Sequence, residues 1–273
     1  MKMKIKVKLI NILPNYIEEY VCKNIHLNSF GPIPDKTLYK IQHSIQNTFN
    51  YNIKIEVINS IKSAYIKESI MKHHHRLEKY SNYIIDNYLK IPILDLSAKF
   101  NLSPMTLLRF ILEQKYKQKL KYLIANNKLN LIDNEQYKIA STNDIYANLH
   151  QLDQSIESLK FEKMIEEYLI KLNIKYITQE ELTIEQNQKY GHSISTPDFE
   201  IKSELYINDQ KVNWIDAKNF YGSNNNFQKS KINKQINKYI VNYGKGCIIY
   251  NHGFNSKLAF DNVLILDYDS LIA

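Results

Sequence analysis

Cysteine is scarce in this sequence, and the two cysteines that it has lie far apart. Cys22 and Cys247 form no CxxC pair. A disulfide framework and a cysteine-based zinc site both need more cysteines at closer spacing, so the sequence argues against both. We therefore expect a reducing compartment, the nucleus or the cytoplasm, and not secretion.

Long apolar runs are also missing. No segment approaches the roughly 18 consecutive apolar residues that a membrane-spanning helix needs. The first residues, MKMKIKVKLINILP, are charged, but their apolar part is too short for a secretory signal and alternates as in an amphipathic strand. The sequence therefore predicts neither a membrane span nor a membrane partner.

Arginine is nearly absent, since only Arg76 and Arg109 occur among 36 basic residues. With so much Lys, Asn, Ile and Tyr, this indicates AT-rich codon usage, which weakens any argument from lysine number alone. The formal charge of +8 is nevertheless uneven. Residues 1–150 carry 22 basic and 12 acidic side chains, a charge of +10, whereas residues 151–273 carry 14 and 16, a charge of −2. The basic part can attract phosphate backbones, although a solvated surface explains it equally well.

Helical periodicity marks the first part of the chain. From Leu13 to about Leu89 the apolar residues recur at the spacing of an α-helix. A short helix that ends near Phe100 is then followed by Ser103 as an N-cap and by Pro104 at the first helical position. This punctuation predicts a helix-turn-helix over residues 91–116, although plain helix bundles use the same kind of turn.

The second helix of this predicted unit would have one apolar face. The residues expected in the core are Leu107, Leu108, Ile111 and Leu112. Thr106 and Arg109 would then point outward, where they could contact a groove or a phosphate of nucleic acid. Residues 125–150 are rich in Asn and weakly periodic, so they predict a linker or an irregular connection.

From about residue 151 the pattern changes to strands mixed with helices. The predicted elements are a helix at Ser155–Leu172, strands near Tyr176, at Thr196–Ile207 and at Lys211–Phe220, a helix at about Phe227–Asn242, and strands at 247–251 and 263–268. A turn at NDQ, residues 208–210, would join two of these strands as a hairpin. The chain is thus predicted as α+β, with an all-helical region before a mixed sheet covered by helices.

Charged residues interrupt both strands of that hairpin. Side chains two apart share one face of a strand, so Asp216 and Lys218 lie side by side, and the hairpin would bring Asp198 next to them. Two neighbouring carboxylates repel, and a hard cation such as Mg²⁺ relieves the repulsion by binding both. With a lysine beside it, such a site favours metal-assisted phosphodiester hydrolysis. An ordinary exposed charge pair is the alternative.

These segments carry a resemblance to a known family. TPDF at residues 196–199 and WIDAK at residues 214–218, with the helix at 161–169 and the segment 235–254, resemble the PD-(D/E)XK nuclease superfamily. More closely they resemble its TPD-motif family, the codanin-interacting nucleases. KHHH at residues 72–75 and the segment 93–113 occur in the same order as in that family, so the resemblance covers most of residues 65–270.

The resemblance implies a domain organisation. Residues 151–273 would form a restriction-endonuclease-like α/β nuclease domain. Residues 1–150 would form a helical region, with the helix-turn-helix, that binds nucleic acid or a protein partner.

The resemblance also implies roles for single residues. Asp198 and Asp216 would bind Mg²⁺, for which Mn²⁺ can substitute, and the backbone carbonyl of Ala217 would add a ligand. Lys218 would be the catalytic lysine. Glu162 matches the acidic residue that such nucleases place beside the metal. A further residue, Gln235, matches a polar residue that the following helix directs at the substrate or at the lysine.

Three functions remain open at this point. The first is a metal-dependent nuclease, with DNA expected rather than RNA and with structured or branched DNA among the substrates. The second is a catalytically silent nuclease fold that binds a codanin-like protein partner. The third is a helix-turn-helix regulator with a degenerate C-terminal domain. The intact set of Asp198, Asp216 and Lys218 favours the enzyme, because a scaffold has no physical need for clustered charge.

Overall fold

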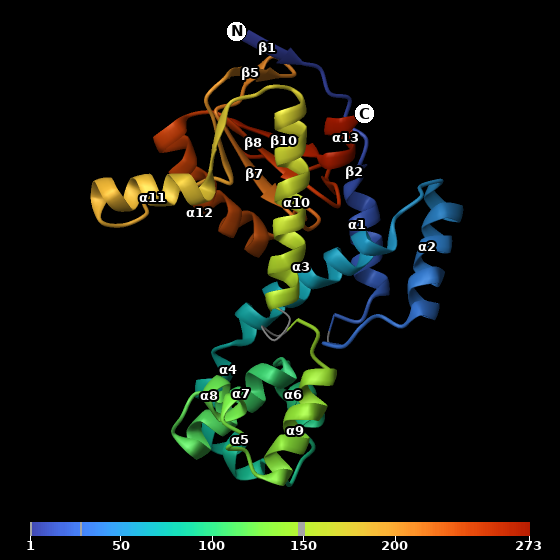
Figure 1. The fold of residues 1–273 in the computed structure, drawn as a ribbon. Coiled ribbons are helices and arrows are strands. Elements are labelled where there is room, and N and C mark those ends of the chain that lie inside the picture. Colours follow the sequence, from blue (N-terminus) through green and yellow to red (C-terminus); the bar gives the residue numbers. More distant parts are fainter. Residues whose placement is uncertain (1, 28, 147–150) are drawn as a thin grey trace. The chain divides into compact units, whose positions relative to one another are not determined.

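The chain folds as a mixed α and β protein with two compact units. The computed structural model describes residues 2–27, 29–146 and 151–273 (Figure 1). The sheet unit comprises Met1–Val21, Ser44–Ile61 and Asp153–Ala273, and the helical unit comprises Cys22–His43 and Lys62–Leu152. The chain therefore passes between the units several times, whereas the sequence suggested one boundary near residue 150. Within the described ranges, no helix is long and apolar enough to cross a membrane.

Helices dominate the N-terminal part of the chain, as its periodicity predicts. Three of them, α1 (Asn15–Asn24), α2 (Asp35–Phe49) and α3 (Ile55–His73), have residues in both units. The helical unit continues with α4 (Arg76–Lys79), α5 (Ser81–Asn87), α6 (Ile93–Phe100), α7 (Pro104–Tyr116), α8 (Leu120–Ala125) and α9 (Leu131–Thr142). Its core includes the four residues of α7 that the sequence placed there, each at most 2% exposed.

The turn between α6 and α7 follows the capping pattern of the sequence. Asn101 ends α6 in the left-handed region at φ 50°, and the Ser103 side chain accepts a 3.1 Å hydrogen bond from the Thr106 backbone N–H. Pro104 occupies the start of α7, where its missing N–H costs no helical hydrogen bond. The two helices and their turn are therefore present as predicted.

Helix α9 contradicts the linker that was predicted over residues 125–150. Asn130 caps it by accepting a 2.8 Å hydrogen bond from the Asp133 N–H. The Asp133 carboxylate is fully buried, where it accepts hydrogen bonds from Tyr88, Lys115 and Tyr116. Helix α9 buries Asp133 and Ala140, so its sequence has little apolar periodicity. The prediction of a linker was therefore wrong here. Residues 147–150, the end of the predicted linker, lie outside the described residues.

The sheet unit is built on a five-stranded mixed sheet with the order β10-β8-β7-β4-β3. Its strands are β3 (Tyr176–Thr178), β4 (Phe199–Ile201), β7 (Trp214–Lys218), β8 (Gly246–Tyr250) and β10 (Val263–Asp267). Strands β7, β8 and β10 run parallel to one another, and β4 runs antiparallel to both β7 and β3.

Two helices pack on opposite faces of this sheet (Figure 1). Helix α10 (Gln151–Lys171) packs through Phe161, Ile165 and Leu169 on the face that carries Ile215. Helix α12 (Asn226–Tyr243) packs on the face that carries Trp214. Gly246 lies under the Trp214 ring, where a Cβ atom would come within 2.1 Å of it, so this position of β8 requires glycine.

Each of the two long predicted strands is divided in the structure, so the hairpin is shorter than predicted and joins other strands. Residues 196–207 give β4 and β5 (Glu204–Ile207), and residues 211–220 give β7, after a short β6 (Gln210–Lys211). The turn at Asn208 and Asp209, both at positive φ, joins β5 to β6 and not β4 to β7. Strand β5 leaves the main sheet because β1 (Lys2–Ile5) pairs with it in parallel, forming a separate sheet in the order β1-β5-β6.

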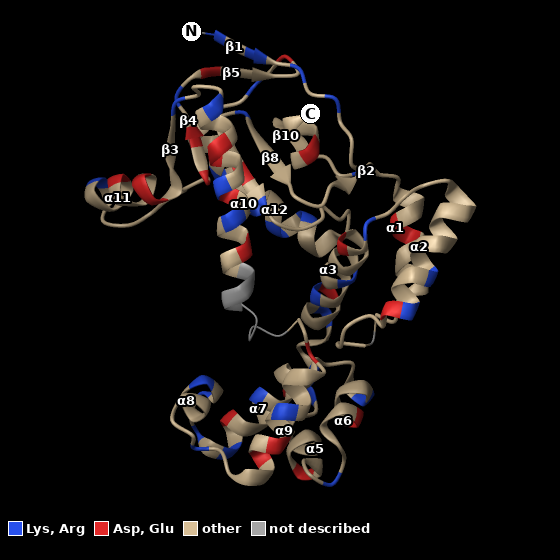
Figure 2. Ribbon diagram, turned by 45° about the vertical axis from the view of Figure 1, so that its right-hand side comes forward, with Lys and Arg blue, Asp and Glu red and all other residues tan. Residues whose placement is uncertain are grey.

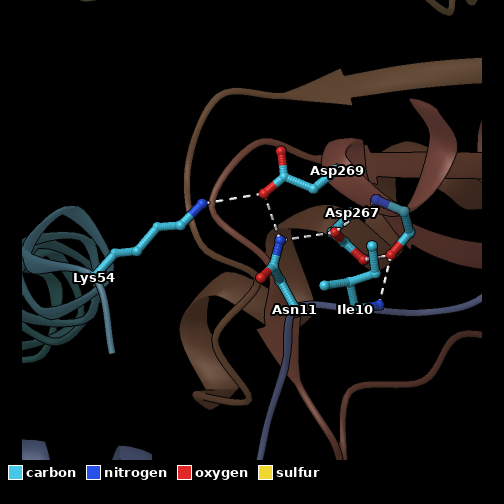
Figure 3. Close-up of polar contacts among 6 residues, drawn as sticks. Ile10, Asn11, Lys54, Asp267 and Asp269 are labelled. Atoms are coloured by element: carbon cyan, nitrogen blue, oxygen red, sulfur yellow. Dashed lines mark hydrogen bonds and ion pairs between the residues drawn. The ribbon is translucent and has the colours of Figure 1, made fainter. Parts of the chain in front are cut away.

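Side-chain contacts tie the first residues of the chain to its end (Figure 3). Asn11 Nδ2 donates hydrogen bonds to Asp267 Oδ1 at 2.9 Å and to Asp269 Oδ2 at 2.8 Å, and Lys54 Nζ lies 3.1 Å from the same Asp269 oxygen. The Ile10 N–H donates to Ser270 Oγ at 2.7 Å. Strand β2 (Ile12–Leu13) pairs with β9 (Phe254–Asn255), and α13 (Tyr268–Ile272) follows β10. The N-terminal segment therefore belongs to the sheet unit.

Helix α11 (Gln179–Tyr190) was not predicted from the sequence. Thr178 and Glu181 form a capping box at its start, and Gly191 ends it at φ 77°. Among its residues Leu182 alone is buried. Its start and stop signals are clear, but its apolar periodicity is too weak for detection by spacing.

Candidate active site

Strand β7 positions two of the charged residues. Trp214 is fully buried against α12, and side chains two apart share a face of a strand, so Asp216 and Lys218 point to the same side of the sheet as Trp214. The Lys218 and Asp216 side chains are only 13% and 1% exposed. A buried pair of this kind differs from the exposed charge pair that the sequence left open.

Pairing of β4 with β7 brings Asp198 to the same place. The antiparallel register sets Phe199 opposite Ile215, and its continuation by one residue sets Asp198 opposite Asp216. Residues directly opposite one another in an antiparallel pair share a face. The contact is direct, because Asp198 Oδ2 accepts a 2.6 Å hydrogen bond from the Ala217 backbone N–H. Asp198 therefore lies opposite Asp216, through β4–β7 pairing and not through a tight hairpin.

The Lys218 ammonium lies between a carboxylate and an amide. Its Nζ is 2.5 Å from Asp216 Oδ2 and donates a 3.1 Å hydrogen bond to Gln235 Oε1. Asp216 Oδ2 is buried and, within the described residues, receives no hydrogen bond of good geometry, although the ammonium is close. The oxygen therefore keeps lone-pair capacity for a further cation. Gln235, on α12, lies where the resemblance places a polar residue directed at the lysine.

The electrostatics of the cluster reflect its burial. Burial, then the neighbouring Asp216 charge, raise the pKa of Asp198 well above its usual range, against the opposing effects of Lys218 and the Ala217 N–H. Burial lowers the pKa of Lys218, but Asp216 and Asp198 outweigh it, so that the pKa is raised overall. Lys218 is therefore a firmly protonated cation. Two carboxylates face it in little water, so one more positive charge would relieve their repulsion.

Glu162 on α10 lies at the margin of this cluster. Burial and the Asp216 charge raise the pKa of Glu162, and the Lys218 charge lowers it, so its charge interacts with both. In the part of the chain that the structure describes, no hydrogen bond or ion pair joins Glu162 directly to either residue. The structure therefore brings Asp198, Asp216, Lys218 and Gln235 into one contact network and leaves Glu162 next to it.

The donor atoms fit a hard divalent cation. Mg²⁺ prefers oxygen ligands, and two carboxylates converge here. Lys218 O accepts from the Asn251 N–H on the β8 side, and successive carbonyls alternate along a strand, so the Ala217 carbonyl is directed to the Asp198 side. No three Asp, Glu, His or Cys side chains of residues 2–27, 29–146 and 151–273 are grouped so that they could hold a metal. A third protein ligand would therefore come from the Ala217 backbone.

Tyr239 belongs to this site, and the sequence did not single it out. Its hydroxyl accepts a 2.7 Å hydrogen bond from Gln235 Nε2, and it is 3.2 Å from the Thr196 carbonyl and 3.5 Å from Asp216 Oδ1. By binding the amide nitrogen of Gln235, it leaves Oε1 of that amide directed at Lys218. The available signal was its spacing, because residues four apart on a helix share a face.

The two residues proposed for nucleic-acid contact lie in the helical unit and differ in exposure. Arg109 is exposed on α7, as expected. Thr106 is half-buried, and its hydroxyl accepts a 3.0 Å hydrogen bond from Ser103 within the helix cap. Arg109 is therefore free to meet a phosphate, whereas Thr106 already has a capping partner.

Comparison with known proteins places the site residues within a recognised sequence family. A family model described as "Protein of unknown function TPD sequence-motif" matches residues 114–269, which is more than half of the chain. The match spans all the site residues from Glu162 to Gln235 and begins after Arg109. The chain is also similar to an uncharacterized protein of Acanthamoeba polyphaga mimivirus, at 28% identity over 260 residues, or 94% of this chain and 81% of that protein. No solved structure matches the chain.

Proposed function

The chain belongs to the family of proteins with the TPD sequence motif, and from that premise we propose that it is a metal-dependent nuclease of the PD-(D/E)XK type. The carrying observation is that the buried Asp216 carboxylate and the Lys218 ammonium lie on β7 with the half-buried Asp198 carboxylate, directly before β4, bonded to the backbone between them. A protein that only docks a partner has no use for that desolvated charge, which is costly to fold. The placement of α10, β4, β7, α12 and β8 around the charges supports a restriction-endonuclease-like fold for this unit.

In this proposal Asp198 and the residues of β7 act as metal ligands and as a cation. Asp198, Asp216 and the Ala217 carbonyl would hold Mg²⁺, or Mn²⁺ in its place, and Glu162 would add negative charge beside them. When bound, the metal would supply Lewis-acid polarisation of a phosphodiester oxygen. The chain's own contribution is a rigid, largely dry arrangement in which electrostatic interactions are strong.

Lys218 would act on charge that develops during the reaction. Its ammonium is held by Asp216 and by Gln235 Oε1, so it needs no rearrangement when negative charge grows on a phosphate oxygen nearby. Gln235 would keep the ammonium in place without adding a further charge. Nucleic acid is the substrate class that this chemistry fits, and we expect DNA rather than RNA.

The test is a cleavage assay on single-stranded, duplex and branched DNA and RNA, with Mg²⁺ or Mn²⁺ and then with excess EDTA. We expect metal-dependent cleavage that EDTA abolishes. Asp216→Ala should lose both cleavage and metal affinity, which calorimetry with Mn²⁺ would measure. If the parental protein cleaves none of these substrates in either metal yet binds a codanin-like protein through this unit, the docking scaffold is the better interpretation.

A further inference from the structure

Helix α12 carries basic residues without any acidic ones. Its 18 residues include four lysines and no Asp or Glu, and in Figure 2 its ribbon carries blue segments. Ile232, Ile236 and Tyr239 are buried against the sheet, so they fix which way the helix is turned. The apolar side is therefore used within the protein, and the lysine-bearing side is what α12 offers to a partner.

Three of these lysines form one row. Lys231, Lys234 and Lys238 are spaced by three and four residues, which places them on one strip of the helix surface. All three are exposed, and none takes part in an ion pair within the described residues. At 1.5 Å per residue the row extends about 10 Å along the helix axis. Unpaired positive charge at this spacing can meet successive phosphates of one strand.

The row lies next to the site. Gln235 follows Lys234 directly and is one helical turn from both Lys231 and Lys238. Gln235 Oε1 accepts a hydrogen bond from Lys218 Nζ, and Gln235 Nε2 lies 3.4 Å from Asp216 Oδ1. A phosphate that reaches Lys218 would therefore belong to a strand whose neighbouring phosphates pass along the lysine row.

We propose that Lys231, Lys234 and Lys238 form a phosphate track that holds the backbone of a nucleic-acid strand beside Asp216 and Lys218. The inference rests on the proposed nuclease function and adds to it the surface that binds the substrate. The track reads backbone charge and not base sequence, because lysine ammonium groups on a helix flank act as point charges. It therefore gives affinity and orientation rather than sequence specificity.

Other lysine rows of the chain lack these features. The segment formed by β1 and the residues after it also has alternating lysines, but Lys2 lies 3.9 Å from Glu204 and Lys6 forms an ion pair with Asp209. Strands β5 and β6, which lie beside β1, follow the end of β4 that is opposite to Asp198. Lys4 and Lys8 are exposed and make no ion pair in the described contacts, so they form a matched control pair away from the site.

An anionic membrane is a poorer match for the row than nucleic acid is. Helices that bind a membrane surface insert an apolar face between the lipids and keep the basic face outside. The apolar face of α12 is occupied by Trp214 and its neighbours. Only the positive charge of the lysines is left for a partner, and positive charge is what attracts a phosphodiester backbone.

The experiment compares Lys231→Gln/Lys238→Gln with Lys4→Gln/Lys8→Gln, because the two variants lose the same charge. Binding of labelled single-stranded and duplex DNA is measured in EDTA at several salt concentrations. We expect the α12 variant to bind about tenfold more weakly, with a salt slope lowered by roughly 0.7–0.9 per lost phosphate contact, and the β1 variant to match the parent. Lys231→Arg/Lys238→Arg should restore binding, which excludes misfolding as the cause.

The outcomes separate this inference from the proposed function. Equal losses in the two Gln variants, or no loss in the α12 variant, would overturn the phosphate track. Loss of binding to vesicles of anionic lipid, with DNA binding intact, would overturn it as well. If the parent fails to cleave in Mg²⁺ but the α12 variant still loses DNA binding, the track stands and the nuclease proposal falls. In an active enzyme, the α12 variant should raise KM and leave kcat unchanged.

Discussion

The backbone N–H of Ala217 donates a 2.6 Å hydrogen bond to Oδ2 of Asp198. The donor lies on β7 between Asp216 and Lys218, and the acceptor lies at the residue before β4. This contact holds the two strands together where the carboxylates meet. It also favours the charged form of Asp198, which burial and Asp216 disfavour. A bound divalent cation would further favour the charged form of Asp198.

Lys218→Ala should separate metal binding from cleavage. The change removes the ammonium but leaves both carboxylates, so Mn²⁺ should still bind when measured by calorimetry. Cleavage should fall by about 10²-fold or more, the scale for the loss of one preorganised electrostatic group. Lys229→Ala, a lysine at the start of α12 that makes no contact with the cluster in the described residues, serves as the control. Cleavage by Lys218→Ala at the parental rate would show that this lysine has no catalytic role.

Tyr239→Phe should lower kcat by about tenfold, the equivalent of one hydrogen bond. Without the hydroxyl, the Gln235 amide loses the partner that keeps its Oε1 directed at Lys218. KM for DNA should change little, because Tyr239 is buried and does not reach the substrate.

The matched control for this tyrosine is Tyr243→Phe, on the same helix. Its hydroxyl donates to the Ser195 carbonyl at 2.6 Å and contacts neither Gln235 nor Asp216 in the described residues. Equal losses of thermal stability in the two variants, with equal kcat, would show that Tyr239 is only structural.

Arg109→Ala should weaken binding of nucleic acid and leave turnover at saturating substrate unchanged. Arg109 is exposed on α7 of the helical unit, whereas Asp216 and Lys218 lie in the sheet unit. Fluorescence anisotropy in EDTA would measure the affinity, and single-turnover cleavage would measure the rate. Glu113→Ala, on the same helix, should not weaken binding. Loss of turnover at unchanged affinity would contradict a binding role for Arg109.

Asp133→Asn should lower the free energy of unfolding at pH 7 by about 3 kcal/mol, because it removes the buried charge to which three side chains donate hydrogen bonds. Burial raises the pKa of Asp133, but hydrogen bonds from Lys115 and the two tyrosines outweigh it and leave the pKa lowered. A carboxyl with a lowered folded pKa stabilises the fold above its unfolded pKa, and that stability is lost as the pH falls.

The difference between Asp133→Asn and the parent should therefore shrink below about pH 4. Urea unfolding at pH 7, 5 and 3 would measure it. Asp209→Asn, an exposed carboxyl paired with Lys6, should show a much smaller effect throughout. A constant difference from pH 7 to 3 would indicate lost packing and not lost charge.

Local signals in the sequence predicted the local structure well. Ser103 and Pro104 mark the start of α7 because a side-chain oxygen and a missing N–H act within one helical turn. Alternation placed Asp216 and Lys218 on one face for a similar reason. Helices α9 and α11 were missed, since each buries few apolar residues and its caps alone gave no apolar stripe.

Pairing between distant segments could not be predicted from the sequence. A hairpin forms around residues 208–210, but its first strand, β5, also pairs with β1, which lies about 200 residues away in the sequence. Choosing between two partners for β5 depends on the whole arrangement of strands, because the alternating pattern of one strand fits many partners.

The sequence by itself determined which residues carry charge on β7, where α7 begins, and which family the motifs resemble, because these depend on residue type and short spacing. Only the tertiary structure decided that Asp198 stands opposite Asp216, that Asp216 and Lys218 are largely buried, and that Tyr239 contacts Gln235 beside them. The physical reason is that burial and cross-strand register arise from packing among segments far apart in the chain. The same packing leaves Lys231, Lys234 and Lys238 exposed beside the site, with no ion pair among the described residues.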